Sequence, residues 1–362
     1  MKRLILSWSL LLIALAATAG GCAQTLPAKA GASPAVVAPA IPGKSHFALR
    51  DGLRIHLWQK CLPGQEATAA QAGKVALLIH GSTWSGRPDF DLQIRDYSLM
   101  DFLARNGYDV WAIDIHGYGQ SDKTDKDWSD TASAALDLGS ALDYICGLRK
   151  VAKVDVLGWS WGTLIAGVYA ADHPDRIAKL ILYGNVWKGL PGWKTFPAPK
   201  KPYQTNTDRG ARSDFIPGQF ERDVVDAYAQ EALRTDPQSP NGVLVDCSSK
   251  LPMVDPERIT VPTLIIRPEK DPRLQAGRDA GVLREAQDCG QELRLPAGGR
   301  PRHPPGEGPP PLPADRPGLL RPALKSSIVF DIFGQALGTT MVLSGRSMAK
   351  NPKRLQDSVF IY

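Results

Sequence analysis

Apolar residues recur along this chain in two alternating patterns, short continuous runs and longer stretches with helical spacing. Continuous runs predict strands that are buried on both faces of a sheet. They lie at Val75–Ile79, Tyr108–Ile115, Val154–Leu157, Ala178–Tyr183 and Val261–Ile266. Helical spacing occurs between these runs, at Tyr97–Arg105, Thr131–Leu148 and Thr163–Ala171. The alternation predicts an α/β fold with a parallel, doubly wound sheet.

Two segments depart from this alternation. His46–Arg50 and Leu53–Leu62 flank Asp51-Gly52, which predicts an antiparallel hairpin before the first buried strand. Residues 186–256 are rich in Lys and Pro at first and then contain a predicted helix near Phe220–Leu233. An insertion of this size between two strands usually lies over the carboxyl edge of the sheet, where ligands bind. We therefore interpret it as a helical cap.

The N-terminus has the pattern of an export signal. A short basic start precedes the apolar stretch Leu4–Ala19, which is too short for a comfortable membrane span. Small residues before Cys22 resemble a bacterial lipoprotein signal, although Ala stands where that signal usually has Leu. An ordinary cleaved signal is the alternative. We predict a signal peptide at 1–22 with lipidation at Cys22, and an Ala/Pro-rich tether at 23–44.

Export implies a bacterial periplasmic protein, either free or anchored through Cys22 to the cell envelope. That compartment is oxidising, and the four remaining cysteines leave three possible pairings open. They are Cys61, Cys146, Cys247 and Cys289, of which Cys146 lies in an apolar helical stretch and is expected to be buried. No CxxC or His/Cys ligand spacing is present, so we expect no metal.

Length and charge narrow the class of protein. A chain of 362 residues with 43% hydrophobic residues can form a large folded α/β domain and is not wholly disordered. The net charge of +6 comes from the chain ends, because residues 272–362 carry 13 Lys and Arg against 8 Asp and Glu. The body is close to neutral, and this excludes the basic surface that nucleic-acid binding requires.

One pentapeptide carries the chemistry. Gly158-Trp159-Ser160-Trp161-Gly162 follows the predicted strand Val154–Leu157 and opens the next predicted helix. A serine on such a sharp turn projects its hydroxyl above the sheet, and the flanking glycines relieve crowding. A chance turn is the alternative, but the placement between a strand and a helix favours Ser160 as a nucleophile.

Two backbone amides are predicted to form an oxyanion hole beside this serine. The amide of Trp161 follows Ser160 directly. His80-Gly81 follows the first long buried strand, and a turn there presents a second amide, that of Ser82. Two amides aimed at one point stabilise the charge that develops on a carbonyl oxygen.

With these motifs the chain resembles the α/β-hydrolase superfamily between roughly residues 46 and 275. The resemblance rests on His80-Gly81, the Asp114–Ser121 segment, the Ser160 turn and Val261–Asp271. It implies the α/β-hydrolase fold, a mostly parallel doubly wound sheet with a helical cap insertion, in a core domain at 45–275.

The resemblance also implies the acid of a catalytic triad. The family places this acid after the strand that follows the cap, and Asp271 matches the position. Its role would be to orient the catalytic imidazole and stabilise its charge. A helix N-cap is the alternative for Asp271, because Pro272 follows it, and Glu269 is the backup acid.

Ser at the nucleophile position implies acyl transfer to water, whereas epoxide hydrolases and haloalkane dehalogenases of the family use Asp. We therefore predict a serine hydrolase that cleaves a small carboxylic ester, thioester or amide through an acyl-enzyme, without a cofactor. Trp84 and Trp159 are candidates for an apolar acyl pocket, with core packing as an equal alternative for Trp159. His116 is expected to be structural.

The catalytic base is the difficult assignment. His303 is the last histidine of the chain, but residues 296–322 around it hold 10 Pro and 5 Gly, unlike any strand end. Shifting the reading frame by one base across Arg300–Gly308 permits Asp-His-Ala-Ile-His-Leu-Glu-Lys, which resembles the catalytic His loop of the family. We hypothesise a frameshift near residue 273, which makes 276–362 an atypical, poorly ordered tail.

Two outcomes follow for the base. Either His303 reaches Ser160 on a flexible loop, or the competent histidine is missing. In the second case the chain is a non-catalytic or inactivated protein of the same fold.

Overall fold

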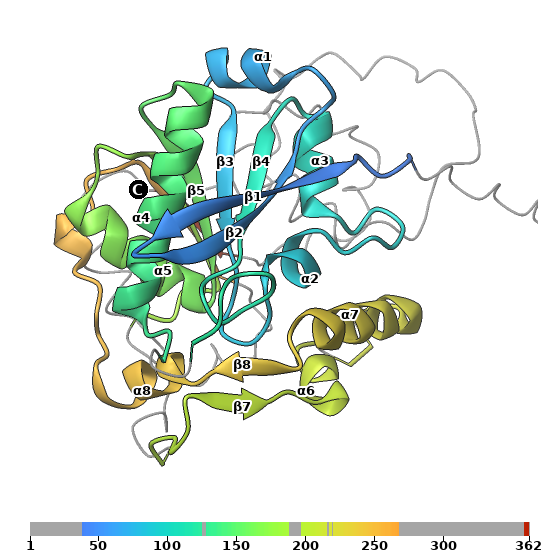
Figure 1. Ribbon diagram of the computed structural model, residues 1–362, viewed down its shortest axis with the longest axis vertical. Coiled ribbons are helices and arrows are strands. Elements are labelled where there is room, and N and C mark those ends of the chain that lie inside the picture. The colour runs from blue at the N-terminus through green and yellow to red at the C-terminus, as the bar shows by residue number, and fades with distance from the viewer. Residues whose placement is uncertain are drawn as a thin grey trace, which may run out of the picture. The chain divides into compact units, whose positions relative to one another are not determined.

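A central sheet of eight strands organises the chain (Figure 1). The computed structural model describes residues 38–124, 128–187, 197–215, 217–218, 220–267 and 358–361. The strands of the sheet are β1 Gly43–Arg50, β2 Leu53–Lys60, β3 Val75–Ile79, β4 Asp109–Ile113, β5 Val154–Trp159, β6 Ile177–Tyr183, β9 Thr263–Arg267 and β10 Ser358–Ile361. They lie in the order β1-β2-β4-β3-β5-β6-β9-β10, and neighbours from β4 to β9 are parallel. The predicted mostly parallel sheet is confirmed.

Helices pack on both faces of this sheet. The helices outside the cap are α1 Glu66–Gln71, α2 Gly86–Phe90, α3 Leu99–Arg105, α4 Thr131–Arg149 and α5 Trp161–Asp172. In β3, Leu77 and Ile79 belong to the cluster that contains α4 and α5. Ala76 and Leu78 belong to a second cluster with α3. Burial on both faces explains why the strand reads as one continuous apolar run.

The hairpin predicted before the first buried strand is confirmed. β1 pairs antiparallel with β2, and Arg50 lies opposite Leu53. The turn residues Asp51 and Gly52 have φ angles of 50° and 87°. A two-residue hairpin turn of this type needs positive φ at both positions, which Asp tolerates and Gly adopts freely. β2 continues antiparallel onto β4, so the hairpin extends one edge of the sheet.

A cap of short elements is inserted between β6 and β9. Its elements are β7 Tyr203–Thr205, α6 Asp208–Arg212, α7 Arg222–Thr235, β8 Gln238–Pro240 and α8 Gly242–Ser249. β7 and β8 form a separate antiparallel pair. Figure 1 shows this pair together with α6 and α7 beyond one end of the sheet strands. The helix predicted near Phe220–Leu233 is confirmed as α7, while the outer limits 186 and 256 stay a prediction.

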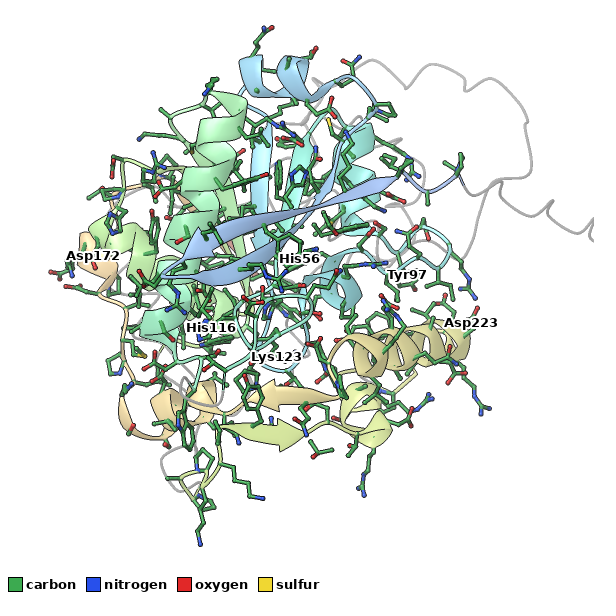
Figure 2. All side chains as sticks on the ribbon, in the orientation of Figure 1. His56, Tyr97, His116, Lys123, Asp172 and Asp223 are labelled. Atoms are coloured by element: carbon green, nitrogen blue, oxygen red, sulfur yellow. The ribbon has the colours of Figure 1, made fainter. Side chains whose placement is uncertain are left out.

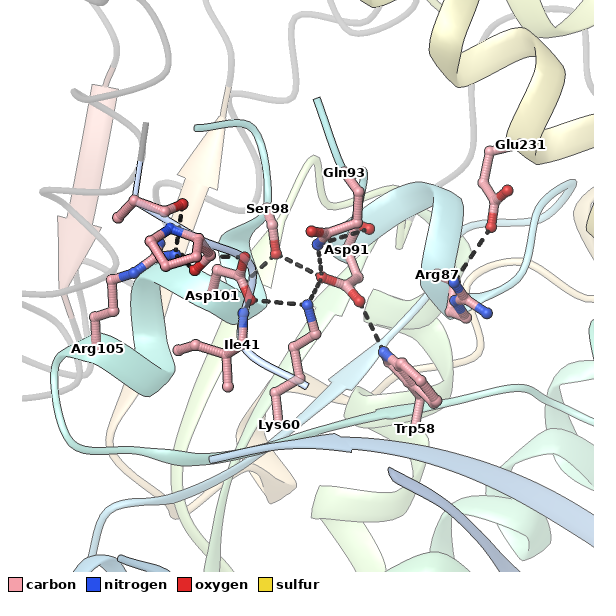
Figure 3. Close-up of polar contacts among 12 residues, drawn as sticks. Ile41, Trp58, Lys60, Arg87, Asp91, Gln93, Ser98, Asp101, Arg105 and Glu231 are labelled. Carbon is pink, nitrogen blue, oxygen red and sulfur yellow. Dashed lines mark hydrogen bonds and ion pairs between the residues drawn. The ribbon is translucent and has the colours of Figure 1, made fainter. Parts of the chain in front are cut away.

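A buried ionic network fixes the segment around Ile41, near the start of the described residues (Figure 3). Lys60 Nζ lies 2.6 Å from Asp91 Oδ1 and 2.8 Å from Asp101 Oδ1. Asp101 Oδ1 also accepts a hydrogen bond from the N–H of Ile41 at 3.2 Å. Trp58 Nε1 donates to Asp91 Oδ2 at 2.7 Å. The network ties the entry at Ile41 to β2 and α3.

The three described cysteines are buried thiols that form no disulfide with one another. They are Cys61, Cys146 and Cys247. Burial raises the pKa of the Cys61 thiol to about 11 and that of Cys247 to about 12. Cys146 is buried in α4, as its apolar surroundings predict. Cys289 lies outside the described residues.

Several predicted segments also lie outside the described residues. They are the signal peptide at 1–22 with Cys22, most of the tether at 23–44, and the tail at 276–362 apart from 358–361. Those four residues form β10, which pairs antiparallel with β9. Among the described helices, none combines the length and apolar composition that a membrane crossing requires.

Candidate active site

Ser160 occupies a strained turn between β5 and α5. Its φ of 53° and ψ of −115° lie in a region that non-glycine residues rarely adopt. The N–H of Ser160 donates to the carbonyl oxygen of Tyr183 at 2.9 Å, and the N–H of Thr163 donates to the Ser160 carbonyl at 2.9 Å. The side chain is half-buried, and its hydroxyl makes no hydrogen bond to any described residue. The hydrogen bonds of the turn therefore fix the backbone of Ser160 and leave its hydroxyl without a hydrogen-bond partner among the described residues.

The two glycines that flank the turn are required by close backbone approach. A Cβ atom on Gly158 would lie 2.2 Å from the carbonyl oxygen of Gly162. A Cβ atom on Gly162 would lie 2.5 Å from the carbonyl oxygen of Ile79, at the end of β3. Any side chain at either position would push α5 away from the sheet.

The loop 80–85, which follows β3, runs beside Ser160. A Cβ atom built on Gly81 would lie 3.6 Å from Ser160 Cβ. His80 Nδ1 donates to the carbonyl oxygen of Gly81 at 2.7 Å, and its Nε2 accepts from the N–H of Ile115 at 3.1 Å. Complete burial lowers the pKa of His80, so the ring is neutral and this tautomer is fixed.

This bond of His80 sets the direction of the Ser82 amide. In a trans peptide the C=O and N–H groups point in opposite directions. Because the Gly81 carbonyl faces the His80 ring, the N–H of Ser82 faces away from that ring. The hydroxyl of Tyr118 holds the next carbonyl, that of Ser82, at 2.6 Å.

The amides of Ser82 and Trp161 have no hydrogen-bond acceptor among the described residues. Trp161 is the first residue of α5, so its N–H has no partner within the helix. The positive end of the helix dipole lies at the same point. Two unused donors and a half-buried hydroxyl together can bind and attack a polarised carbonyl group.

The tryptophans near the site differ in their surroundings. Trp84 is 2% exposed, packs in a cluster with α7, and donates from Nε1 to Asp214 Oδ2 at 2.8 Å. Trp159 is half-buried, and its ring lies 3.6 Å from the Cβ position of Gly81. The Trp161 ring is buried and donates to Thr131 Oγ1 at 2.9 Å. Trp159 therefore borders the Ser160 turn, Trp84 is enclosed, and a pocket role for either stays a prediction.

None of the five described histidines offers a ring nitrogen to Ser160. The ring contacts of three of them are His46 with Tyr144 and Gln59, His56 with Asp114 and Ser45, and His80 with Gly81 and Ile115. His116, labelled in Figure 2, is fully buried and bonds Asp137 through Nδ1. His173 follows the last residue of α5, about 18 Å of helix from Ser160. The chain has 6 histidines, so His303 is the one imidazole left.

The predicted acid and base lie outside the described residues. β9 ends at Arg267, and Asp271 and the backup Glu269 follow it directly. His303 also lies beyond this point. No group of three metal-ligating side chains occurs in the part of the chain that the structure describes. That part supplies the candidate site with the hydroxyl of Ser160 and the backbone amides of Ser82 and Trp161.

Sequence reasoning missed the carboxyl groups that hold the loop 80–85. Asp89 Oδ2 accepts from the N–H of Gly81 at 3.2 Å. Asp236 Oδ2 accepts from the N–H of Ser85 at 2.8 Å, and its Oδ1 from the N–H of Gly119 at 2.7 Å. These contacts join segments far apart in the chain, and no local motif announces them.

Comparisons with known proteins agree with this architecture. A family model described as alpha/beta hydrolase fold matches residues 77–235. The mouse serine hydrolase BPHL is 28% identical over 238 residues, covering 61% of this chain and 68% of that protein. The human serine hydrolase BPHL is 30% identical over 139 residues, covering 37% of this chain and 40% of that protein. The chain thus spans less than half of the human relative.

A solved structure of a bacterial membrane phospholipase A is also similar. It is 19% identical, with a TM-score of 0.43, and the match covers 65% of this chain and 72% of that one. The matched region of the family model contains the last three residues of β3, the Ser160 turn and all of α7.

Proposed function

Because the chain belongs to the α/β-hydrolase superfamily, we propose that it is a serine hydrolase that cleaves a small carboxylic ester through an acyl-enzyme on Ser160. The observation that carries the proposal is the positive φ of 53° at Ser160, on a turn that needs glycine at both flanks. A protein retains such strain where the serine hydroxyl has a use.

The reaction divides into two half-reactions. Ser160 Oγ attacks the ester carbonyl while the base, His303 in this proposal, takes the hydroxyl proton. The amides of Ser82 and Trp161 stabilise the oxyanion, and the imidazolium returns its proton to the leaving alcohol. Water then attacks the acyl-enzyme with the same base, and the acid is released. Asp271 would orient the imidazole throughout.

The residue type at the turn favours acyl chemistry over epoxide opening. Epoxide hydrolases of this superfamily attack with a carboxylate, and this chain has Ser160 at that position. Thioesters and amides share the carbonyl chemistry of esters. Trp159, at the border of the turn, supports an apolar acyl group in the substrate.

One observation favours a second candidate function. Five of the 6 histidines have contacts or positions that remove them from Ser160, and the remaining one, His303, lies among prolines. If His303 does not reach the turn, Ser160 lacks a base, and the chain is an inactivated protein of this fold.

We extend the proposal to the location of the protein. An export signal at 1–22 and lipidation of Cys22 would anchor it to the bacterial cell envelope, since several acyl chains hold a protein stably. Fractionation of wild type against Cys22→Ser tests this. Equal release of both into the soluble periplasm would contradict it.

Hydrolysis of p-nitrophenyl esters from acetate to laurate tests the proposed activity. Wild type should turn over one range of acyl lengths, and Ser160→Ala should lose that activity while staying folded. Ser213→Ala removes an exposed hydroxyl beyond α6 and is the matched control. Activity that persists in Ser160→Ala would reject Ser160 as the nucleophile.

A further inference from the structure

The cap holds the loop 80–85 at several points. The contacts join Asn206 Nδ2 to the carbonyl of Thr83 at 3.4 Å, Asp214 Oδ2 to Trp84 Nε1 at 2.8 Å, and Asp236 Oδ2 to the N–H of Ser85 at 2.8 Å. All three partners come from the insertion between β6 and β9. Contacts with the cap, as well as with the sheet, therefore fix the conformation of the loop 80–85 beside Ser160.

One further contact reaches Gly81, which lies beside Ser160 in space although it is distant in the sequence. Asp89 of α2 accepts from the N–H of Gly81 through Oδ2 at 3.2 Å. Its other oxygen, Oδ1, accepts from the hydroxyl of Tyr228 at 3.0 Å. Tyr228 belongs to α7 and is 5% exposed. A single carboxyl group thus links the cap helix to the backbone beside Ser160.

The surroundings of Asp89 disfavour its ionised form. No cation pairs with Asp89 among the described residues. The nearby Arg87 pairs with Glu231 instead. Burial raises the pKa of Asp89 well above its usual range, and the hydrogen bonds from Gly81 and Tyr228 offset part of this rise. Burial also raises the pKa of Tyr228, which keeps its hydroxyl protonated as a donor.

Gly81 is the residue whose freedom this link restricts. Its N–H belongs to one peptide group and its C=O to the next, which also carries the amide of Ser82. Glycine torsions are the least restricted of any residue, so the Ser82 amide can turn away unless both peptide groups are held. His80 holds the second group, and Asp89 holds the first.

We propose that Asp89 and Tyr228 are positioning residues, through which cap helix α7 fixes the Ser82 amide toward the substrate oxygen. This inference rests on the proposed serine hydrolase function. It makes the cap part of the machinery that stabilises the oxyanion, in addition to covering the substrate. Loss of the link should lower the rate of the chemical step and leave substrate binding nearly intact.

Tyr228→Phe and Tyr97→Phe form a matched pair of variants. Tyr97 (labelled in Figure 2) lies before α3 and donates to Oε2 of Glu221, the residue that precedes α7, at 2.7 Å. That contact does not touch the loop 80–85. We expect Tyr228→Phe to lower kcat about tenfold with KM within about twofold, since displacing an oxyanion donor affects the transition state. Tyr97→Phe should keep both constants within about twofold.

Variants of Asp89 separate hydrogen bonding from charge. Asn at position 89 can accept from the N–H of Gly81 through its amide oxygen, and its amide nitrogen can donate to the hydroxyl oxygen of Tyr228, which reverses the direction of the bond that Tyr228 donates to Asp89. Asp89→Asn should therefore retain most of the kcat that Asp89→Ala loses. Equal losses in the two variants would overturn the proposed role of the hydrogen bonds.

Amide hydrogen exchange gives a readout that does not need turnover. Exchange of a peptide covering residues 80–85 should quicken in Tyr228→Phe and stay unchanged in Tyr97→Phe. Equal kcat and equal exchange in the two variants would overturn the inference and leave the serine hydrolase proposal intact. If wild type shows no Ser160-dependent turnover, the proposed function fails, and the exchange comparison alone supports or overturns the link.

Discussion

A Cβ atom on Gly158 would lie only 2.2 Å from the carbonyl oxygen of Gly162. The two glycines bracket Ser160, so the end of β5 and the first turn of α5 approach each other more closely than any side chain permits. This contact is the structural reason for the spacing of the pentapeptide.

We expect Gly158→Ala to destabilise the protein by at least about 1–3 kcal/mol, because the methyl group overlaps backbone that cannot yield. Ester hydrolysis should fall with it, since the turn must widen. Gly147→Ala is the control: no atom lies within 4 Å of its Cβ position in α4, so it should stabilise by about 0.5–1 kcal/mol. Urea unfolding measures both. Equal stability of the two variants would show that the close approach is absent.

Asp155 gives a prediction about pH. It is 2% exposed, and neither carboxyl oxygen has a hydrogen-bond partner among the described residues. Burial raises its pKa from 3.8 to about 6. Folding therefore favours the protonated form, and wild type loses stability as the pH rises through about 4 to 6, by up to about 3 kcal/mol.

Asp155→Asn should remove this loss. We expect the variant to exceed wild type by about 2–3 kcal/mol at pH 7.5, with the difference shrinking toward pH 4. Asp51→Asn, in the exposed hairpin turn, should change stability by less than about 0.5 kcal/mol at either pH. A constant difference between Asp155→Asn and wild type across this pH range would contradict the assignment.

The network around Lys60 predicts a large loss on removal of one carboxylate. The side chains of Lys60 and Asp91 are only 2% and 1% exposed. Asp91→Ala therefore removes one of the two carboxylates that balance the buried charge of Lys60. We expect a loss of about 3–5 kcal/mol in the free energy of unfolding. Glu66→Ala breaks the exposed pair with Lys44 and should cost less than about 1 kcal/mol. Similar losses in both variants would mean that Lys60 is hydrated.

His303 is the remaining candidate for the catalytic base. If it serves Ser160, His303→Ala should reduce ester hydrolysis at least about 100-fold, the usual contribution of a general base. His173→Ala, beyond the far end of α5, should retain activity. Full activity in His303→Ala would remove it from the mechanism. Resequencing the gene would show directly whether the reading frame changes near residue 273.

Local patterns predicted the sheet strands and the Ser160 turn because their causes are local. The run Val75–Ile79 is apolar throughout since both faces of β3 are buried, and the structure places β3 at those residues. The motif around Ser160 is readable because Gly158 is required by a contact with Gly162, four positions along the chain, whereas the contact of Gly162 with Ile79 of β3 is not local. Short α2 escaped prediction, since it contains Gly86 and Pro88 and has no helical period.

Contacts between distant segments could not be predicted in the same way. Tyr228 and Asp89 are separated by 139 positions, and nothing near either residue indicates the other. Lys60 looks like an exposed strand end, because lysine is seldom buried without partners that only the folded chain supplies. Nothing near Trp84 in the sequence indicates its contacts with α7 and Asp214.

Labelling with a fluorophosphonate probe, followed by mass spectrometry of the modified peptide, tests the central claim most directly. The probe bonds covalently to a serine that is activated by a base and faces an oxyanion hole. We expect the label on Ser160 in the wild-type chain and no label in Ser160→Ala. A label on another residue, equal labelling of the two proteins, or an unlabelled wild type would contradict catalysis by Ser160.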